Sequence, residues 1–219
     1  MKLIEIVGIR SVIKFIALLA AIIGTITYKK YKFSNAKYIL FSVWFIAITE
    51  FSYKLFYYYI LDGKTDIFFI SNIYDLVQYN FYLWWFRSLI TDRKKRNMLL
   101  GIAVIHLLLF IANSYFGEFN KPHRYFYALS VILVLIAICF YYVEILKTDR
   151  ILQFERSIYF WFSLGIILFN VPFVPFWYAA DYLHYSGNIY NIVVFSLNAI
   201  LYGCFIIGFL YSKKQYNYS

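Results

Sequence analysis

The chain has 219 residues, of which 63% are hydrophobic and 24% aromatic, and its mean hydropathy is +0.66. A soluble domain is close to half apolar, so this excess cannot be buried in one soluble core of this size. The net charge of +10 would suggest nucleic-acid binding in a soluble protein. Here the basic residues fall in short segments between apolar runs, where they set membrane orientation. We therefore expect the lipid bilayer, and no nucleic acid, as a partner.

Seven apolar runs follow one another along the chain, at about 10–28, 38–61, 67–90, 98–116, 125–146, 158–183 and 189–211. A spanning helix needs about 20 largely apolar residues. Lipid offers the backbone no hydrogen bonds, so each run is predicted to be helical. A membrane barrel would need alternating polar and apolar residues, which ILVLIAIC at 132–139 lacks. The prediction is an all-α membrane protein, a bundle of seven transmembrane helices in a single domain covering 1–219.

Lys and Arg are distributed unevenly between alternate connections. Thirteen lie after the first, third and fifth runs and in the C-terminal tail: Lys29, Lys30, Lys32, Lys37, Arg93, Lys94, Lys95, Arg96, Lys147, Arg150, Arg156, Lys213 and Lys214. Three lie after the second, fourth and sixth runs: Lys64, Lys121 and Arg124. Because Lys-rich and Arg-rich connections stay in the cytoplasm, we expect the C-terminus inside and the N-terminus outside. Lys2, Arg10 and Lys14 oppose this orientation at the first run.

Ionisable side chains within the predicted spans are the first candidates for a functional site, because charge deep in a bilayer is expensive. Glu50 and Lys54 lie one helical turn apart in the second run, with the acid first, which is the favourable order. Asp75 in the third run lies about as deep as Lys54, counting ~1.5 Å per residue. We therefore expect a carboxylate of Glu50 or Asp75 within salt-bridge reach of Lys54. His106 lies near mid-depth in the fourth run.

Polar residues recur at helical spacing in four of the runs. The sets are Ser71, Asp75, Gln78 and Tyr82; His106 and Asn113; Ser163, Asn170 and Trp177; and Asn191, Asn198 and Tyr202. Seven residues make about two turns, so each set faces one way. We expect a common polar interior formed by Asp75, Gln78, His106, Asn170 and Asn198. Such residues either bind a ligand or ion or simply hold helices together; catalysis fits them less well.

The segment NVPFVPFW at 170–177 places Pro172 and Pro175 inside the sixth run. Each proline removes a backbone donor and would kink the helix. The carbonyl groups freed near Asn170 could line a cavity. Two interpretations stay open, a static kink and a hinge or substrate site.

No catalytic residue, metal site or cofactor is predicted. A retinal protein needs a Schiff-base lysine in its last helix, and the run 189–211 contains no Lys. His123 and His184 fall in or beside outside connections, away from His106, so no cluster of metal ligands is predicted. There is no Gly-rich phosphate-binding loop. An enzyme is therefore the less favoured class.

Three segments carry a resemblance to a known group of proteins: SNIYDLVQYNFYLWWFRSLI in the third run, YFWFSLGIILF in the sixth and SLNAILYGCFIIGFLY in the last. With these segments the chain resembles small, uncharacterised seven-helix proteins of the bacterial inner membrane. It is also similar to the membrane sensor portions of some histidine kinases. The resemblance implies a multi-pass protein of the inner (plasma) membrane with a signalling role. It transfers no catalytic residue.

Two functions are expected from these features. The first is a sensory or signalling subunit that binds a small ligand in the helix bundle and acts through a cytoplasmic or membrane partner. The alternative is a transporter or channel for small molecules or ions that uses a buried cluster of Glu50, Lys54 and Asp75. The sequence shows no internal repeat, which argues against many transporter folds.

Overall fold

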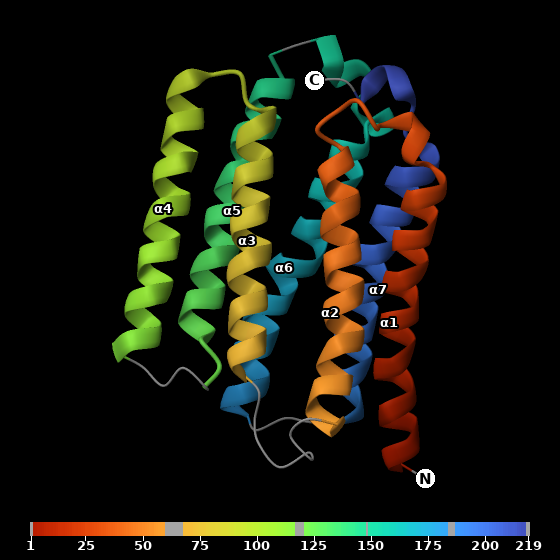
Figure 1. Ribbon diagram of the computed structural model, residues 1–219, viewed down its shortest axis with the longest axis vertical. Helices are drawn as coiled ribbons and strands as arrows, with labels where there is room; N and C mark the ends of the chain where they lie inside the picture. Colours follow the sequence, from red (N-terminus) through yellow and green to blue (C-terminus); the bar gives the residue numbers. More distant parts are fainter. Residues whose placement is uncertain (1, 60–67, 117–120, 148, 184–186, 218–219) are drawn as a thin grey trace. The chain divides into compact units, whose positions relative to one another are not determined.

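The computed structural model describes the backbone of residues 2–59, 68–116, 121–147, 149–183 and 187–217, and the side chains of 12–52, 68–116, 121–147, 153–180, 182–183 and 187–217. In these residues the chain forms seven α-helices and no strand (Figure 1). They are α1 (Lys2–Ile26), α2 (Lys37–Tyr59), α3 (Phe68–Leu89), α4 (Arg93–Phe116), α5 (Arg124–Ile145), α6 (Ile158–Tyr182) and α7 (Asn188–Tyr211). The described residues also form three 3₁₀ segments: η1 (Tyr28–Lys30), η2 (Asp149–Arg156) and η3 (Lys214–Tyr216).

The predicted all-α class with seven helices is confirmed over the described residues. Four of these helices are long and apolar enough to cross a bilayer: α4, α5, α6 up to Ala180, and α7, with mean hydropathies of 2.0, 2.5, 1.7 and 2.2. They indicate a membrane protein. The helix α3 is less apolar because its sequence contains Asn72, Asp75, Gln78 and Asn80. That all seven helices span, and in which orientation, stays a prediction.

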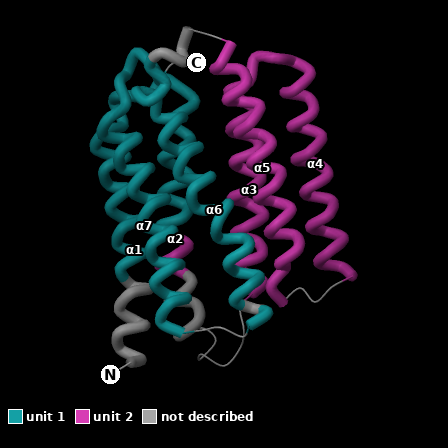
Figure 2. The backbone as a smooth tube through the Cα atoms, turned by 180° about the vertical axis from the view of Figure 1, so that it is seen from behind, with its two compact units in different colours: residues 1–47, 153–219 teal, residues 48–152 magenta. Residues whose placement is uncertain are grey.

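The chain divides into two compact units (Figure 2). Unit 1 comprises residues 1–47 and 153–219, and therefore contains α1, the first part of α2, α6 and α7. Unit 2 is the continuous segment 48–152, with the last part of α2 and all of α3, α4 and α5. Each unit is described by itself below.

In unit 1, α7 lies between α1 and α6 and packs on both. Glycines allow these close approaches. A Cβ atom at Gly165 would lie 3.0 Å from Cβ of Cys204 and 3.2 Å from the backbone oxygen of Leu201. The rings of Phe162 and Phe205 stack beside this contact, 3.9 Å apart and nearly parallel. Small residues and stacked aromatics thus bring α6 and α7 together, as in other helix pairs within membranes.

In unit 2, α3 is the central helix and packs on both α4 and α5. Its side chains Trp85 and Phe86 are fully buried, and Phe86 contacts the ring of Tyr141 on α5. Polar contacts hold the ends of these helices. At one end Asn72 donates from Nδ2 to the carbonyl of Lys121 over 2.9 Å and accepts from the backbone N–H of His123.

The other end of unit 2 carries the connection between α3 and α4. Asp92 accepts a 2.8 Å hydrogen bond from the backbone N–H of Lys94, so it caps the first turn of α4. This bond lowers the pKa of Asp92 below its usual value. Glu144, near the end of α5, accepts from both the backbone N–H and the hydroxyl of Thr91. The basic segment at the start of α4 is therefore held on a fixed backbone.

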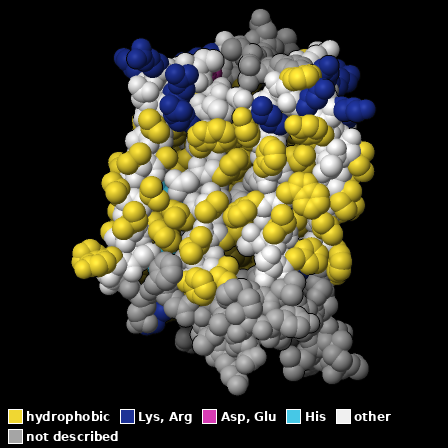
Figure 3. Space-filling model, in the orientation of Figure 1, with side chains coloured by type: hydrophobic (Ala, Val, Ile, Leu, Met, Phe, Trp, Pro, Cys, Tyr) yellow, Lys and Arg dark blue, Asp and Glu magenta, His cyan; other side chains and the backbone are white. Residues whose placement is uncertain are grey.

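The outer surface of the helices is apolar. Along α4 the exposed large apolar residues include Met98, Leu100, Val104, Ile105, Leu107, Leu108, Leu109 and Ile111. On the face drawn in Figure 3, hydrophobic side chains cover the middle of the helices, and Lys and Arg lie mainly toward the helix ends. A soluble protein rarely exposes so much continuous apolar surface, whereas a bilayer covers it.

Candidate functional site

A cavity of about 240 Å³ lies within unit 2, between the last part of α2 and the first part of α3. The lining residues described are Thr49 and Glu50 on α2, and Ile70, Ser71 and Tyr74 on α3. Small-molecule sites usually measure about 300–1,000 Å³, so this cavity fits a compact molecule. Glu50 was predicted as a site residue, and the structure places it in the lining of a cavity.

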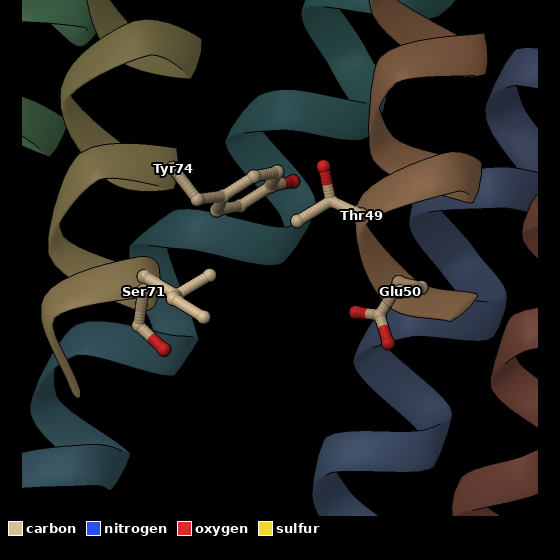
Figure 4. A pocket seen from close by; sticks show the side chains of 5 residues that line it. Thr49, Glu50, Ser71 and Tyr74 are labelled. Carbon is tan, nitrogen blue, oxygen red and sulfur yellow. The ribbon is translucent and has the colours of Figure 1, made fainter. Parts of the chain in front are cut away.

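The spacing of the lining residues explains why they meet. Ile70, Ser71 and Tyr74 lie within about one turn of α3, and residues four apart in a helix share a face. Figure 4 shows the Tyr74 side chain reaching from α3 toward Thr49, while the Glu50 carboxylate points from α2 toward α3. Both helices therefore contribute polar groups to the same space.

The chemistry of the described lining is that of a hydrogen-bonding site with one negative charge. Glu50 supplies a carboxylate, and Thr49, Ser71 and Tyr74 supply hydroxyl groups that both donate and accept. A carboxylate bonds most strongly to a positively charged or polarised donor. The lining therefore suits a small molecule that carries an amine or several hydroxyl groups.

Asp75 follows the lining residue Tyr74 on α3 and is half-buried. Two buried phenols, those of Tyr79 and Tyr127, lie close enough to Asp75 to interact with it electrostatically. The two phenol hydroxyls share a hydrogen bond, and their rings meet edge to face at 5.6 Å. Among the described residues, no donor is hydrogen-bonded to the Asp75 carboxylate. Asp75 is thus a second acidic residue near the site in sequence, next to the lining residue Tyr74.

His106 on α4 is fully buried and lies in a polar chain that crosses three helices. Its Nδ1 lies 2.9 Å from Nδ2 of Asn80 on α3, and its Nε2 lies 2.7 Å from the Ser130 hydroxyl on α5. Ser130 in turn donates to the carbonyl of Phe126 over 2.7 Å, and the Phe126 ring stacks on the imidazole at 4.5 Å. The structure thus gives His106 a role in joining α3, α4 and α5.

The remaining predicted residues are not among the described residues that line this cavity. Gln78 is buried on α3. In unit 1, Asn170 and Asn198 donate from Nδ2 to Ile166 and Val194, each four residues earlier in its own helix. Asn170 is buried, whereas Asn198 is partly exposed. A common interior of the five predicted residues stays a prediction, because three belong to unit 2 and two to unit 1.

Helix α6 continues through both of its prolines, from Ile158 to Tyr182. Pro172 and Pro175 are both exposed. Their rings therefore lie on the outer, apolar surface of the helix. The hinge interpretation stays a prediction. The Lys54 side chain lies outside the described residues, and so does the predicted ion pair with Glu50 or Asp75.

Several residues of the site were not singled out in the sequence. They are Thr49 and Tyr74 in the cavity lining and Asn80 and Ser130 on either side of His106. Tyr74 lies three residues after Ser71, so helical spacing would have found it. Thr49 is only the sequence neighbour of Glu50, and helical spacing does not point to it. Asn80 and Ser130 give no such signal, since their meeting depends on how three helices are rotated.

The described side chains include no group of three or more His, Cys, Asp and Glu residues arranged to hold a metal ion. Comparison of the chain with models of protein families, with curated proteins and with solved structures gives no match.

Proposed function

We propose that the chain is a signalling subunit of a bacterial inner membrane that binds a small polar molecule in the cavity between α2 and α3. The observation that carries the proposal is the meeting of a carboxylate and three hydroxyl groups in a space of about 240 Å³. A carboxylate and hydroxyl groups that face one space can form several hydrogen bonds with a compact polar molecule. Ligand identity is restricted to compact molecules with an amine or hydroxyl groups.

Helix α3 connects the cavity with the basic segment at the start of α4. Ile70, Ser71 and Tyr74 sit in the first two turns of α3, which ends at Leu89. The basic segment that begins α4, from Arg93 to Arg96, starts four residues after Leu89 and is exposed except for a half-buried Lys95. A ligand that bridges α2 and α3 favours one setting of α3. That setting is carried along the helix to the basic segment, where a cytoplasmic partner with an acidic surface would bind.

The first experiment measures ligand-dependent stability. A library of small amines and polyhydroxylated compounds is screened by thermal unfolding of the purified protein in detergent. A ligand at 100 times its Kd stabilises the folded state by about 2.7 kcal/mol. Glu50→Gln removes a charge-assisted hydrogen bond and should weaken a binding amine by about tenfold to a hundredfold. Glu155→Gln, an exposed acid of unit 1, is the control and should bind normally.

The transporter alternative is favoured by one specific observation, the half-buried Asp75 carboxylate directly after Tyr74. A protonatable acid beside a ligand site is the arrangement that couples proton movement to transport. Uptake of the identified compound into proteoliposomes separates the two functions. A transporter would lose uptake in Asp75→Asn while still binding. A library in which Glu50→Gln responds like the native protein to every compound contradicts both functions at this cavity.

A further inference from the structure

One end of unit 1 is a rigid assembly of three segments that are distant in sequence. The backbone N–H of Lys213 donates to the carbonyl of Arg156 over 2.9 Å. The Tyr159 hydroxyl donates to the carbonyl of Asn217 over 2.9 Å, and the Tyr216 hydroxyl donates to Gln153. The segment after α7 is therefore fixed to η2 and to the start of α6.

The connection after α1 joins the same assembly. The Lys30 ammonium donates to the carbonyl of Leu210 over 2.7 Å, and so satisfies one of the free carbonyls at the end of α7. Tyr31 is fully buried, its ring lies 5.7 Å from that of Phe209, and its hydroxyl donates to the carbonyl of Gly24. Burial raises the pKa of Tyr31, which keeps this donor protonated.

Four exposed lysines stand on this fixed backbone: Lys29, Lys32, Lys213 and Lys214. We call them the basic platform. Arg156 is half-buried beside them, and Glu155 is the exposed acid from the adjoining segment, so the net charge is strongly positive. Because the backbone beneath the four lysines is held in place, binding an anion restricts only their side chains.

The platform lies at the depth of lipid headgroups. Lys213 comes two residues after Tyr211, where the candidate span α7 ends, and Lys29 comes three residues after Ile26, where α1 ends. The side chains around it are apolar and open, with Ile26 75% and Phe33 69% exposed. The Lys32 ammonium lies 4.4 Å from the centre of the Phe33 ring. Aromatic rings and lysines combined at a span end are typical of the bilayer interface.

We infer that the basic platform binds the phosphate headgroup of an anionic phospholipid. Charge complementarity and depth together favour lipid over an acidic protein segment, since the exposed rings would lie among acyl chains and the ammonium groups among phosphates. The inference is independent of the proposed function, because it uses residues of unit 1 only and needs no ligand in the cavity.

The test measures retention of lipid by the purified full chain. The protein in detergent is exposed to equal amounts of phosphatidylglycerol and phosphatidylcholine, and bound lipid is counted by native mass spectrometry at low and high salt. The platform variant changes Lys29, Lys32, Lys213 and Lys214 to Gln. A matched control changes Arg93, Lys94, Arg96 and Lys147, four exposed cations of unit 2, to Gln.

We expect the native protein and the control variant to retain phosphatidylglycerol in preference to phosphatidylcholine, and the platform variant to retain at least about tenfold less of it. Equal retention of the two lipids by the native protein overturns the inference. An equal loss in both variants also does so, because it would mark general electrostatic attraction. If only a polyglutamate peptide distinguishes the variants, the surface binds acidic protein and the inference is wrong. Should the fourfold variant fail to fold, Lys213→Gln with Lys214→Gln gives the same readout.

Discussion

The amide nitrogen of Asn80 is hydrogen-bonded both to Nδ1 of His106 and to the carbonyl of Leu76, each over 2.9 Å. The second bond fixes the orientation of the amide, because a reversed amide would place its oxygen against the Leu76 oxygen. The nitrogen therefore donates to Nδ1, which must be an acceptor. The proton of the neutral imidazole is then on Nε2, from which it is donated to Ser130.

This relationship predicts non-additive mutations. Asn80→Ala leaves Nδ1 of His106 buried without its donor and should lower the free energy of unfolding by about 1–3 kcal/mol. Combining it with His106→Phe should cost less than the sum of the two single changes, since the unmatched acceptor is then absent. Unfolding by denaturant in mixed micelles measures all three variants. Additive losses would show that the two side chains are not coupled.

A pair of glycine variants tests the packing of unit 1. Gly165→Ala places a Cβ 3.0 Å from Cys204 and 3.2 Å from the Leu201 backbone, and should destabilise by about 1–3 kcal/mol. Gly203→Ala is the matched control, because no atom lies within 4 Å of its Cβ position. That change should be neutral or stabilise by up to about 1 kcal/mol. Thermal unfolding compares the two; equal shifts would contradict the close approach of α6 and α7.

Asn217 tests the attachment of the segment after α7. It is fully buried, accepts from the backbone N–H of Ile158 over 3.0 Å, and donates to Ser212. Asn217→Ala leaves the Ile158 N–H buried without an acceptor and should cost about 1–3 kcal/mol. Asn217→Asp keeps that acceptor at the start of α6 and should cost less. Limited proteolysis near residue 213 reports release of the segment, and similar cleavage of both variants would argue against this role.

The cap at Asp92 predicts a pH dependence. Backbone donation from Lys94 lowers the pKa of Asp92 below its ordinary value of 3.8. A lowered pKa in the folded state means that the stabilisation is complete above the unfolded value and is lost as the pH falls through the folded one. Native protein should therefore be more stable than Asp92→Ala at pH 7, and the difference should shrink below about pH 4. Thermal unfolding at both pH values measures it. A constant difference would show that the charge contributes nothing.

The orientation is tested by reporter fusions. The excess of Lys and Arg on one set of connections predicts a cytoplasmic signal both at Ser219 and in the connection 91–97. A periplasmic signal at either position would exclude the predicted topology and would also place the basic platform on the outer face. Fusions in the connection after α4 serve as the opposite control.

The sequence was sufficient for the helices because spanning segments leave a strong signal, a run of about 20 apolar residues. The sequence predicted the ends of the helices less well. Helix α1 begins at Lys2, before the run 10–28, because hydropathy marks what crosses a bilayer and not where backbone hydrogen bonding starts. The sequence also did not indicate that the connection 147–156 contains the 3₁₀ segment η2.

For the candidate site, the type and depth of polar residues pointed to individual side chains, but the sequence did not indicate which side chains contact one another. Depth and charge led to Glu50, which lines the cavity. His106 was found for the same reason, but its partners Asn80 and Ser130 depend on helix rotation. Seven-residue spacing places a side chain on a face without saying what that face meets. Asn170 and Asn198 show this, since each donates to its own helix.

Unit 1 consists of one segment that precedes unit 2 in the sequence and one that follows it, and α1 from the first packs on α7 from the second. During synthesis the ribosome therefore delivers α1 long before its partner, and the whole of unit 2 is inserted in between. Unit 2 is continuous and can associate as it emerges. In the predicted topology α1 then lies in lipid and exposes the face that is buried in the folded protein, which carries Ala17, Ala20 and Ala21. These side chains are small and apolar, so acyl chains cover them without penalty until α7 arrives.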